Sequence, residues 1–187
     1  MRERFTTVMN LGLSRFSTVV ILIIVAALSR VVPHPFNFTP IGAMALFGAA
    51  QFNRKIFAFM IPVVAMLLSD ALIGNPSFPT YFSFALIAGF GVVYLKKLNA
   101  GRLLTASIAA SVVFFIITNF FVWFGGTMYP QTWQGLIGCY TAGLAFYQQT
   151  FFGNLFLNTV MGDLFYNTLL FGAYYSIEKI AFKPTVA

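Results

Sequence analysis

The chain has 187 residues, of which 59% are hydrophobic and 8% charged, and its mean hydropathy is +0.86. An average soluble domain is about 25% charged, so a water-exposed globule of this length would lack the charge needed to cover its surface. The composition excludes a soluble enzyme, a disordered chain and a secreted disulfide scaffold. It predicts an all-α, polytopic membrane protein.

Six apolar segments follow one another along the chain and predict six transmembrane helices. A span needs about 20 mostly apolar residues, and short or tilted helices use fewer. The predicted spans are about 16–32, 41–52, 56–73, 81–95, 103–124 and 151–177. The stretch 134–149 carries more polar residues, so we expect it to lie at the interface or to re-enter the membrane without crossing it. Residues 1–187 are expected to form a single transmembrane domain.

The cations predict the orientation of these segments. Cytoplasmic loops carry an excess of Lys and Arg, and ten of the eleven cations fall on one side of the six spans. These ten are Arg2, Arg4, Arg15, Arg54, Lys55, Lys96, Lys97, Arg102, Lys179 and Lys183. Both termini are therefore expected in the cytoplasm, with Arg30 on the outer side of a bacterial inner membrane. For the first segment, a cleaved signal peptide is the alternative interpretation. The scattered cations form no basic face for nucleic acid.

Polar residues inside the predicted spans gather toward the outer half of the membrane. Such groups are costly in lipid unless they face a partner or a cavity, so they predict a pocket for a small solute. The predicted lining is Asn119, Trp123, Asn154, Asn158, Asp163, His34 and Asn37. In this pocket the amides would hydrogen-bond the solute, Trp123 would stack on it, and Asp163 would meet a cation or a hydrogen-bond donor.

A structural interpretation of the same residues stays open. Buried amides also join helices by hydrogen bonds, and Arg30 with Asp70 is expected to form an ion pair between the first and third spans. Small residues four apart allow close helix contact. Two interpretations stay open for them: packing inside the bundle, or a docking face for another membrane subunit. The pairs are Ala45 with Ala49, Ala106 with Ala110, and Ser107 with Ser111.

The last predicted span carries two polar pairs. Asn154 and Asn158 share one helix face, and so do Asp163 and Asn167, but an unbroken helix places the two pairs on nearly opposite sides. Either the span bends at Gly162 or the pairs have different roles. The first pair is the better candidate for a ligand, and the second for helix packing.

No catalytic constellation stands out in the sequence. There is one His and one Cys, and there is no metal-binding, nucleotide-binding or nucleophile motif. We therefore expect neither an enzyme nor a bound cofactor or metal ion. The chain is also not expected to drive transport with ATP by itself.

Four motifs resemble a bacterial membrane family without assigned function. They are Pro-His-Pro-Phe-Asn-Phe-Thr-Pro-Ile-Gly-Ala-Met-Ala-Leu-Phe-Gly at 33–48, Leu-Ser-Asp at 68–70, Thr-Asn-Phe at 118–120 and Gly-Asp-Leu-Phe-Tyr at 162–166. The resemblance implies membership of such a family and brings no chemistry with it.

In its layout the chain is similar to the S components of energy-coupling factor (ECF) transporters. This resemblance implies a six-helix bundle that binds a vitamin-like solute on its outer side. It also implies a partner complex of a membrane scaffold subunit with ATPases. The first span lacks the Ala-x-x-x-Ala patch with which many S components dock that scaffold. The alternative resemblance is to the small six-span rod-shape-determining subunits, which implies a non-transport scaffold in envelope or cell-shape assembly.

Overall fold

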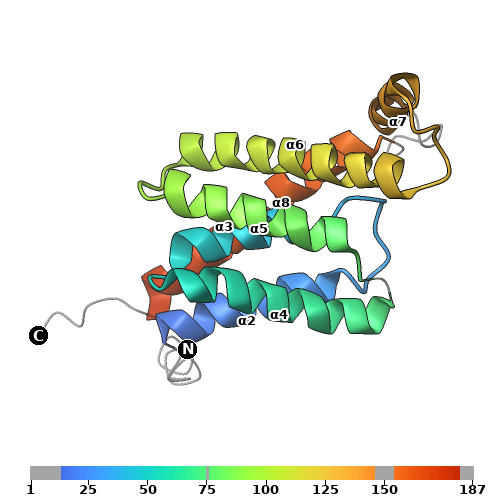
Figure 1. The fold of residues 1–187 in the computed structure, drawn as a ribbon. Coiled ribbons are helices and arrows are strands. Elements are labelled where there is room, and N and C mark those ends of the chain that lie inside the picture. Colours follow the sequence, from blue (N-terminus) through green and yellow to red (C-terminus); the bar gives the residue numbers. More distant parts are fainter. Residues whose placement is uncertain (1–13, 75, 146–153, 182–187) are drawn as a thin grey trace, which may run out of the picture.

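The computed structural model describes residues 14–74, 76–145 and 154–181, and in this part of the chain every regular element is a helix (Figure 1). The all-α class predicted from composition is therefore confirmed for the described residues. The seven helices are α2 (Arg15–Ser29), α3 (Ile41–Gln51), α4 (Lys55–Ile73), α5 (Phe78–Tyr94), α6 (Ala100–Gly125), α7 (Trp133–Ala145) and α8 (Leu155–Ala181).

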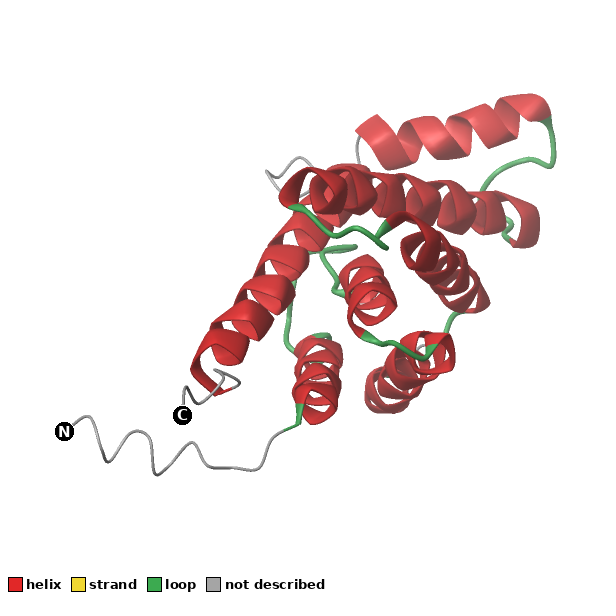
Figure 2. Cartoon of the chain, turned by 90° about the vertical axis from the view of Figure 1, so that its left-hand side faces the viewer, coloured by secondary structure: helices red, strands yellow, loops and turns green. Residues whose placement is uncertain are grey.

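The short helix α3 forms the centre of the bundle. Its sequence is apolar on all sides, which is typical of a fully enclosed helix, and residues 41–49 are all buried. It contacts α2, α4, α5, α6 and α8 (Figure 2). Glycines allow this close packing: a Cβ added at Gly91 of α5 would lie 2.9 Å from the Cβ of Ala49. The segment 41–52, the shortest of the predicted spans, thus forms a helix that five other helices contact.

Several helix ends follow from local sequence. The side chain of Ser14 accepts from the backbone N–H of Ser17 and begins α2, and that of Asn99 accepts from the N–H of Arg102 and begins α6. Gly74, with a φ of 76°, ends α4 in the left-handed conformation that glycine adopts without a steric penalty. These signals place the helix ends within a few residues of the predicted spans.

Two helices of the described chain, α4 and α6, are long and apolar enough to cross a membrane. By length and composition they suggest that the protein associates with a membrane. The helices α2, α3 and α5 are apolar but shorter. Large apolar side chains also lie on the outside of the bundle, among them Val25, Leu72 and Val93, each at least 60% exposed.

The helix α7 lies across one end of the bundle. In Figure 1 the helices α2, α4, α5 and α6 run roughly side by side, whereas α7 is turned across them, and Figure 2 shows it lengthwise outside α6. Its 13 residues correspond to about 20 Å. Its buried face is a row of small residues four apart, Gly135, Cys139 and Gly143. This helix covers most of the stretch 134–149, whose residues 146–149 lie outside the described part.

Candidate functional site

The segment between α2 and α3 contains a tight turn at Pro35–Phe38. The N–H of Phe38 donates to the carbonyl of Pro35 at 3.0 Å, and Asn37 has a φ of 63°. A type II turn needs a positive φ at its third residue, where Gly or Asn is favoured. The backbone of the turn thus accounts for Asn37, which the sequence placed in the solute pocket.

The helix α8 receives this turn along one face. The side-chain amide of Asn158, itself buried, donates to the carbonyl of Phe36 at 2.9 Å. One helical turn further on, a Cβ added at Gly162 would lie 3.0 Å from the nitrogen of Thr39 and 3.2 Å from the Cα of Phe38. The glycine therefore allows the loop backbone to lie directly on α8. In consequence, the non-helical segment before α3 packs directly against α8.

Asp163 lies where the loop becomes helix α3. Its carboxyl group is buried, accepts from the hydroxyl of Ser111 on α6 at 2.7 Å, and accepts a backbone hydrogen bond from Ala43. Pro40, which precedes α3, provides no side-chain cap. The first N–H groups of a helix need acceptors and favour negative charge. Asp163 of α8 thus supplies the cap that α3 lacks in its own sequence.

A second hydrogen bond continues the contact between α6 and α8. The side-chain amide of Asn167 donates to the hydroxyl of Ser107 at 2.9 Å. Asp163 and Asn167 are four residues apart on α8, as Ser111 and Ser107 are on α6, so the two bonds form an antiparallel ladder. The side-chain oxygen of Asn167 is buried and has no hydrogen-bond partner among the described residues. The serines that the sequence marked as small packing residues also carry polar contacts.

The two charges expected to pair do lie together near the same end of the bundle. A guanidinium nitrogen of Arg30 is 2.7 Å from a carboxylate oxygen of Asp70, and another donates to Ser69 at 2.6 Å. The hydroxyl of Tyr81 donates to the other oxygen of Asp70 at 2.5 Å. These contacts of Arg30, Asp70 and Tyr81 connect α2, α4 and α5. Each carboxylate oxygen of Asp70 has a donor beside it, one from Arg30 and one from Tyr81.

Asn119 and Trp123 belong to the contact between α6 and the segment that follows it. The amide of Asn119 donates to the carbonyl of Phe115 on its own helix at 2.9 Å, and a Cβ added at Gly143 of α7 would lie 2.9 Å from its oxygen. The indole N–H of Trp123 donates to the carbonyl of Pro130 at 2.9 Å. In this structure α7 covers Asn119.

The remaining two predicted lining residues have separate positions. The side chain of Asn154 accepts from the N–H of Leu157 at 2.8 Å, as an N-cap of α8 does, and it also donates to the carbonyl of Leu144. His34 is exposed, with a ring nitrogen 3.0 Å from the carbonyl of Pro35. The structure thus brings Asn158, Asp163 and the Asn37 turn together. The other four predicted lining residues, Asn119, Trp123, Asn154 and His34, have partners of their own.

None of the seven predicted solute ligands lines any of three cavities that described residues form. The largest of these three, about 540 Å³, lies at the opposite end of the bundle, where α2 and α4 begin and α3 and α8 end. An apolar groove of about 380 Å³ runs between α2 and α4. A third of about 320 Å³ adjoins Asp70 and Gly74. The sequence did not predict the cavity of about 540 Å³, because the residues that line it come from four separate helices and their ends.

Comparison with known proteins gives a family and no activity. A family model with the description "Family of unknown function (DUF6580)" matches residues 11–185. No curated protein and no solved structure matches the chain.

Proposed function

We propose that this chain, which belongs to the family of unknown function DUF6580, is a six-span inner-membrane protein that binds a small solute on its outer side for uptake. The proposed role is that of an ECF S component, with a membrane scaffold subunit and ATPases as partners. One observation carries the proposal: Asn158 and Asp163, two buried polar side chains of α8, bond to the loop that precedes α3 and to the first turn of α3.

Membrane physics supports a site at this place. The 11 residues of α3 extend about 16 Å, roughly half of a hydrocarbon core of about 30 Å. Non-helical backbone is tolerated at membrane depth only where protein buries it or where it lines a cavity. In transporters, helices that begin inside the membrane build substrate sites with their exposed N-termini. The N-terminus of α3 is such an end, and Asp163 occupies it here.

The proposed binding step exchanges internal hydrogen bonds for bonds to the solute. Asn158 now holds the carbonyl of Phe36, and Asp163 holds Ser111 and the start of α3. When the turn at 35–38 withdraws, the amide of Asn158 becomes available to the solute, and the carboxyl group of Asp163 can accept from a donor or cation of the solute. Asn119, Trp123, Asn154, His34 and Asn37 lie at the same end of the bundle and complete the proposed lining.

Ligand-induced thermal stabilisation in detergent tests this proposal. Native mass spectrometry of the purified protein first identifies any co-purifying small molecule, which then serves as the probe. The wild-type protein should be stabilised by it, and Asn158→Ala should abolish the response. Asn167→Ala is the matched control, because it removes a buried amide of the same helix outside the proposed lining. An unchanged response in Asn119, Asn158 and Asp163 variants would contradict the pocket.

The second candidate is a non-transport membrane scaffold, and one observation favours it. Asn119, Asn158 and Asp163 all bond to groups of the chain itself, as side chains that only hold helices together would. For this role we expect a protein that purifies without a bound solute and co-purifies with membrane proteins of envelope assembly and without ATPases.

A further inference from the structure

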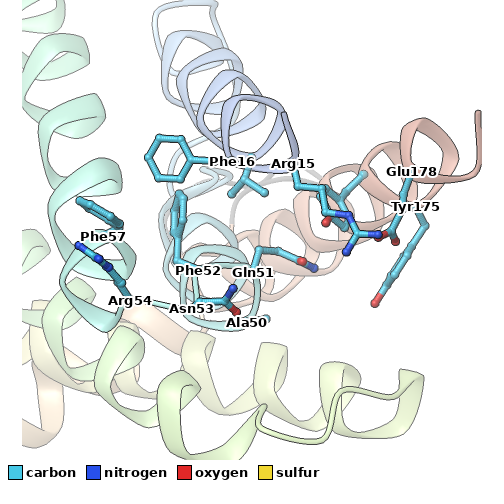
Figure 3. A pocket seen from close by; sticks show the side chains of 12 residues that line it. Arg15, Phe16, Ala50, Gln51, Phe52, Asn53, Arg54, Phe57, Tyr175 and Glu178 are labelled. Carbon is cyan, nitrogen blue, oxygen red and sulfur yellow. The ribbon is translucent and has the colours of Figure 1, made fainter. Parts of the chain in front are cut away.

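The cavity at the predicted cytoplasmic end of the bundle combines basic, amide and aromatic side chains (Figure 3). It lies between the first turns of α2 and α4 and the last turns of α3 and α8, and its volume is about 540 Å³. Its lining includes Arg15, Phe16, Gln51, Asn53, Arg54, Phe57 and Glu178. This end of the bundle is the one that the distribution of cations assigns to the cytoplasm.

The charges of the cavity favour an anion. Arg15 lies 3.4 Å from Glu178, so these two charges largely offset each other. Arg54, on the other side of the cavity in Figure 3, forms no ion pair with a described residue. The amides of Gln51 and Asn53 lie between them. That of Gln51 bonds to Tyr175, and that of Asn53 can donate hydrogen bonds. The cavity thus presents an unneutralised cation beside neutral donors.

An apolar groove continues from this cavity along the outside of the bundle. Phe16 and Phe57 line both the cavity and the groove between α2 and α4. The other groove residues are Val20, Ile24, Met60, Ile61, Val64, Ala65 and Leu68. From Phe57 to Leu68 the groove follows α4 for about 16 Å. Met60, Val64 and Leu68 are each more than half exposed, so the groove is open to the surroundings of the helices.

We propose that the cavity and the groove together bind one anionic glycerophospholipid of the cytoplasmic leaflet. The phosphate lies beside Arg54, and one acyl chain lies in the groove between α2 and α4. A basic pocket between helices at the cytoplasmic surface is a typical site for an anionic headgroup. A free phosphate ester would use the cavity alone, whereas a lipid uses both parts. The inference rests on the membrane orientation in the proposed function, but not on its solute site.

Competition between two lipids with identical acyl chains tests the proposal. The purified full-length protein is mixed in detergent with phosphatidylglycerol and phosphatidylcholine, and native mass spectrometry measures the bound ratio. The wild type should prefer phosphatidylglycerol. Arg54→Gln should lower that preference about fivefold, since a basic residue near a membrane surface contributes about 1 kcal/mol. Lys96→Gln, which removes an exposed cation of the same end outside the cavity, should leave it unchanged.

A second pair of variants tests the groove. Val64→Trp fills it and should reduce the binding of both lipids, whereas Val93→Trp, an equally bulky change on the exposed face of α5, should not. Both positions are more than half exposed, so the variants should fold, and their melting temperatures verify this.

Three results would overturn the lipid site: equal binding of the two lipids by the wild type, an unchanged preference in Arg54→Gln, or unchanged lipid binding in Val64→Trp. Glycerol 3-phosphate, tested alone, distinguishes a free phosphate ester from a lipid. If it binds as tightly as the lipid, and Val64→Trp does not weaken it, the site takes the soluble ester and the proposal is wrong. Asn158→Ala should bind phosphatidylglycerol as the wild type does, so failure of the solute pocket would not affect this result.

Discussion

The carboxylate of Asp163 occupies the space that a side chain at Gly42 would need. A Cβ added at Gly42 would lie 2.7 Å from an oxygen of that carboxylate. The glycine thus allows the carboxyl group of α8 to reach the first turn of the central helix, 121 residues earlier in the chain. Substitutions at these two residues and at their neighbours therefore test the contacts described above.

Replacing Gly42 with Ala should destabilise the protein by about 1–3 kcal/mol, the usual cost of adding a methyl group to a packed core. The new methyl group would push the carboxylate of Asp163 away from the start of α3. Gly89→Ala is the control, because a Cβ at this helical position meets no atom within 4 Å, and Ala favours a helix over Gly. Thermal unfolding in detergent compares the two, and equal stability of both variants would contradict the packing described.

A double-mutant cycle should detect the ladder between α6 and α8. The pair Ser107→Ala and Asn167→Ala should show a coupling of about 0.6 kcal/mol, as interhelical hydrogen bonds in membrane proteins do on average. The pair Ser111→Ala and Asp163→Ala should couple at least as strongly, because the carboxyl group accepts from Ser111 at the shorter distance of 2.7 Å. Ser107→Ala with Asp163→Ala joins no bonded pair and serves as the reference. If the reference pair couples as strongly, the coupling does not come from these two hydrogen bonds.

Breaking the ion pair of Arg30 and Asp70 on one side should be strongly destabilising. Arg30→Gln leaves a buried carboxylate without its cation, and removing one partner of a buried pair costs about 3–5 kcal/mol. Tyr81→Phe removes one hydrogen bond to the same carboxylate and should cost about 1–3 kcal/mol. The melting temperatures of the two variants should follow this order. The reverse order would show that the tyrosine, and not the arginine, is the main partner of Asp70.

Labelling in intact cells checks the proposed topology. The chain has one cysteine, Cys139, so a Cys139→Ser background permits single cysteines to be introduced. His34→Cys should react with a membrane-impermeant maleimide in intact cells, because it lies in the exposed outer loop of the proposed topology. Lys97→Cys, between α5 and α6, should react only after lysis. Reaction of both positions in intact cells, or of neither, would contradict the assigned orientation.

Local sequence properties are sufficient to predict six of the seven helices in the described part of the chain. The predicted segment 103–124 lies inside α6 (Ala100–Gly125), and 56–73 differs from α4 (Lys55–Ile73) by one residue. Hydropathy, caps and glycine positions depend on neighbours within a few residues, so they are readable from the chain alone. The membership in a family without assigned function was also predicted from local motifs and is confirmed.

The roles of the polar residues in α8 required the tertiary structure. The sequence left open whether this span bends at Gly162 or whether its two polar pairs have different roles. The helix α8 runs unbroken from Leu155 to Ala181, and Gly162 makes room for the loop that lies on it. The pairs do differ: Asn158 holds the loop, whereas Asn167 bonds to α6. The spacing of residues along α8 does not indicate which side chain bonds to the loop and which bonds to α6.

Hydropathy, charge and local motifs thus determined where six of the described helices lie and which residues are costly to bury. Only the tertiary structure decided how each buried polar group is satisfied. The partner of Asp163 is Ser111, 52 residues away, and the cavity at the other end joins four helix ends. Such pairings depend on the packing of α3 among its neighbours. They arise because a buried hydrogen-bonding group must find a partner in space, wherever that partner lies in the sequence.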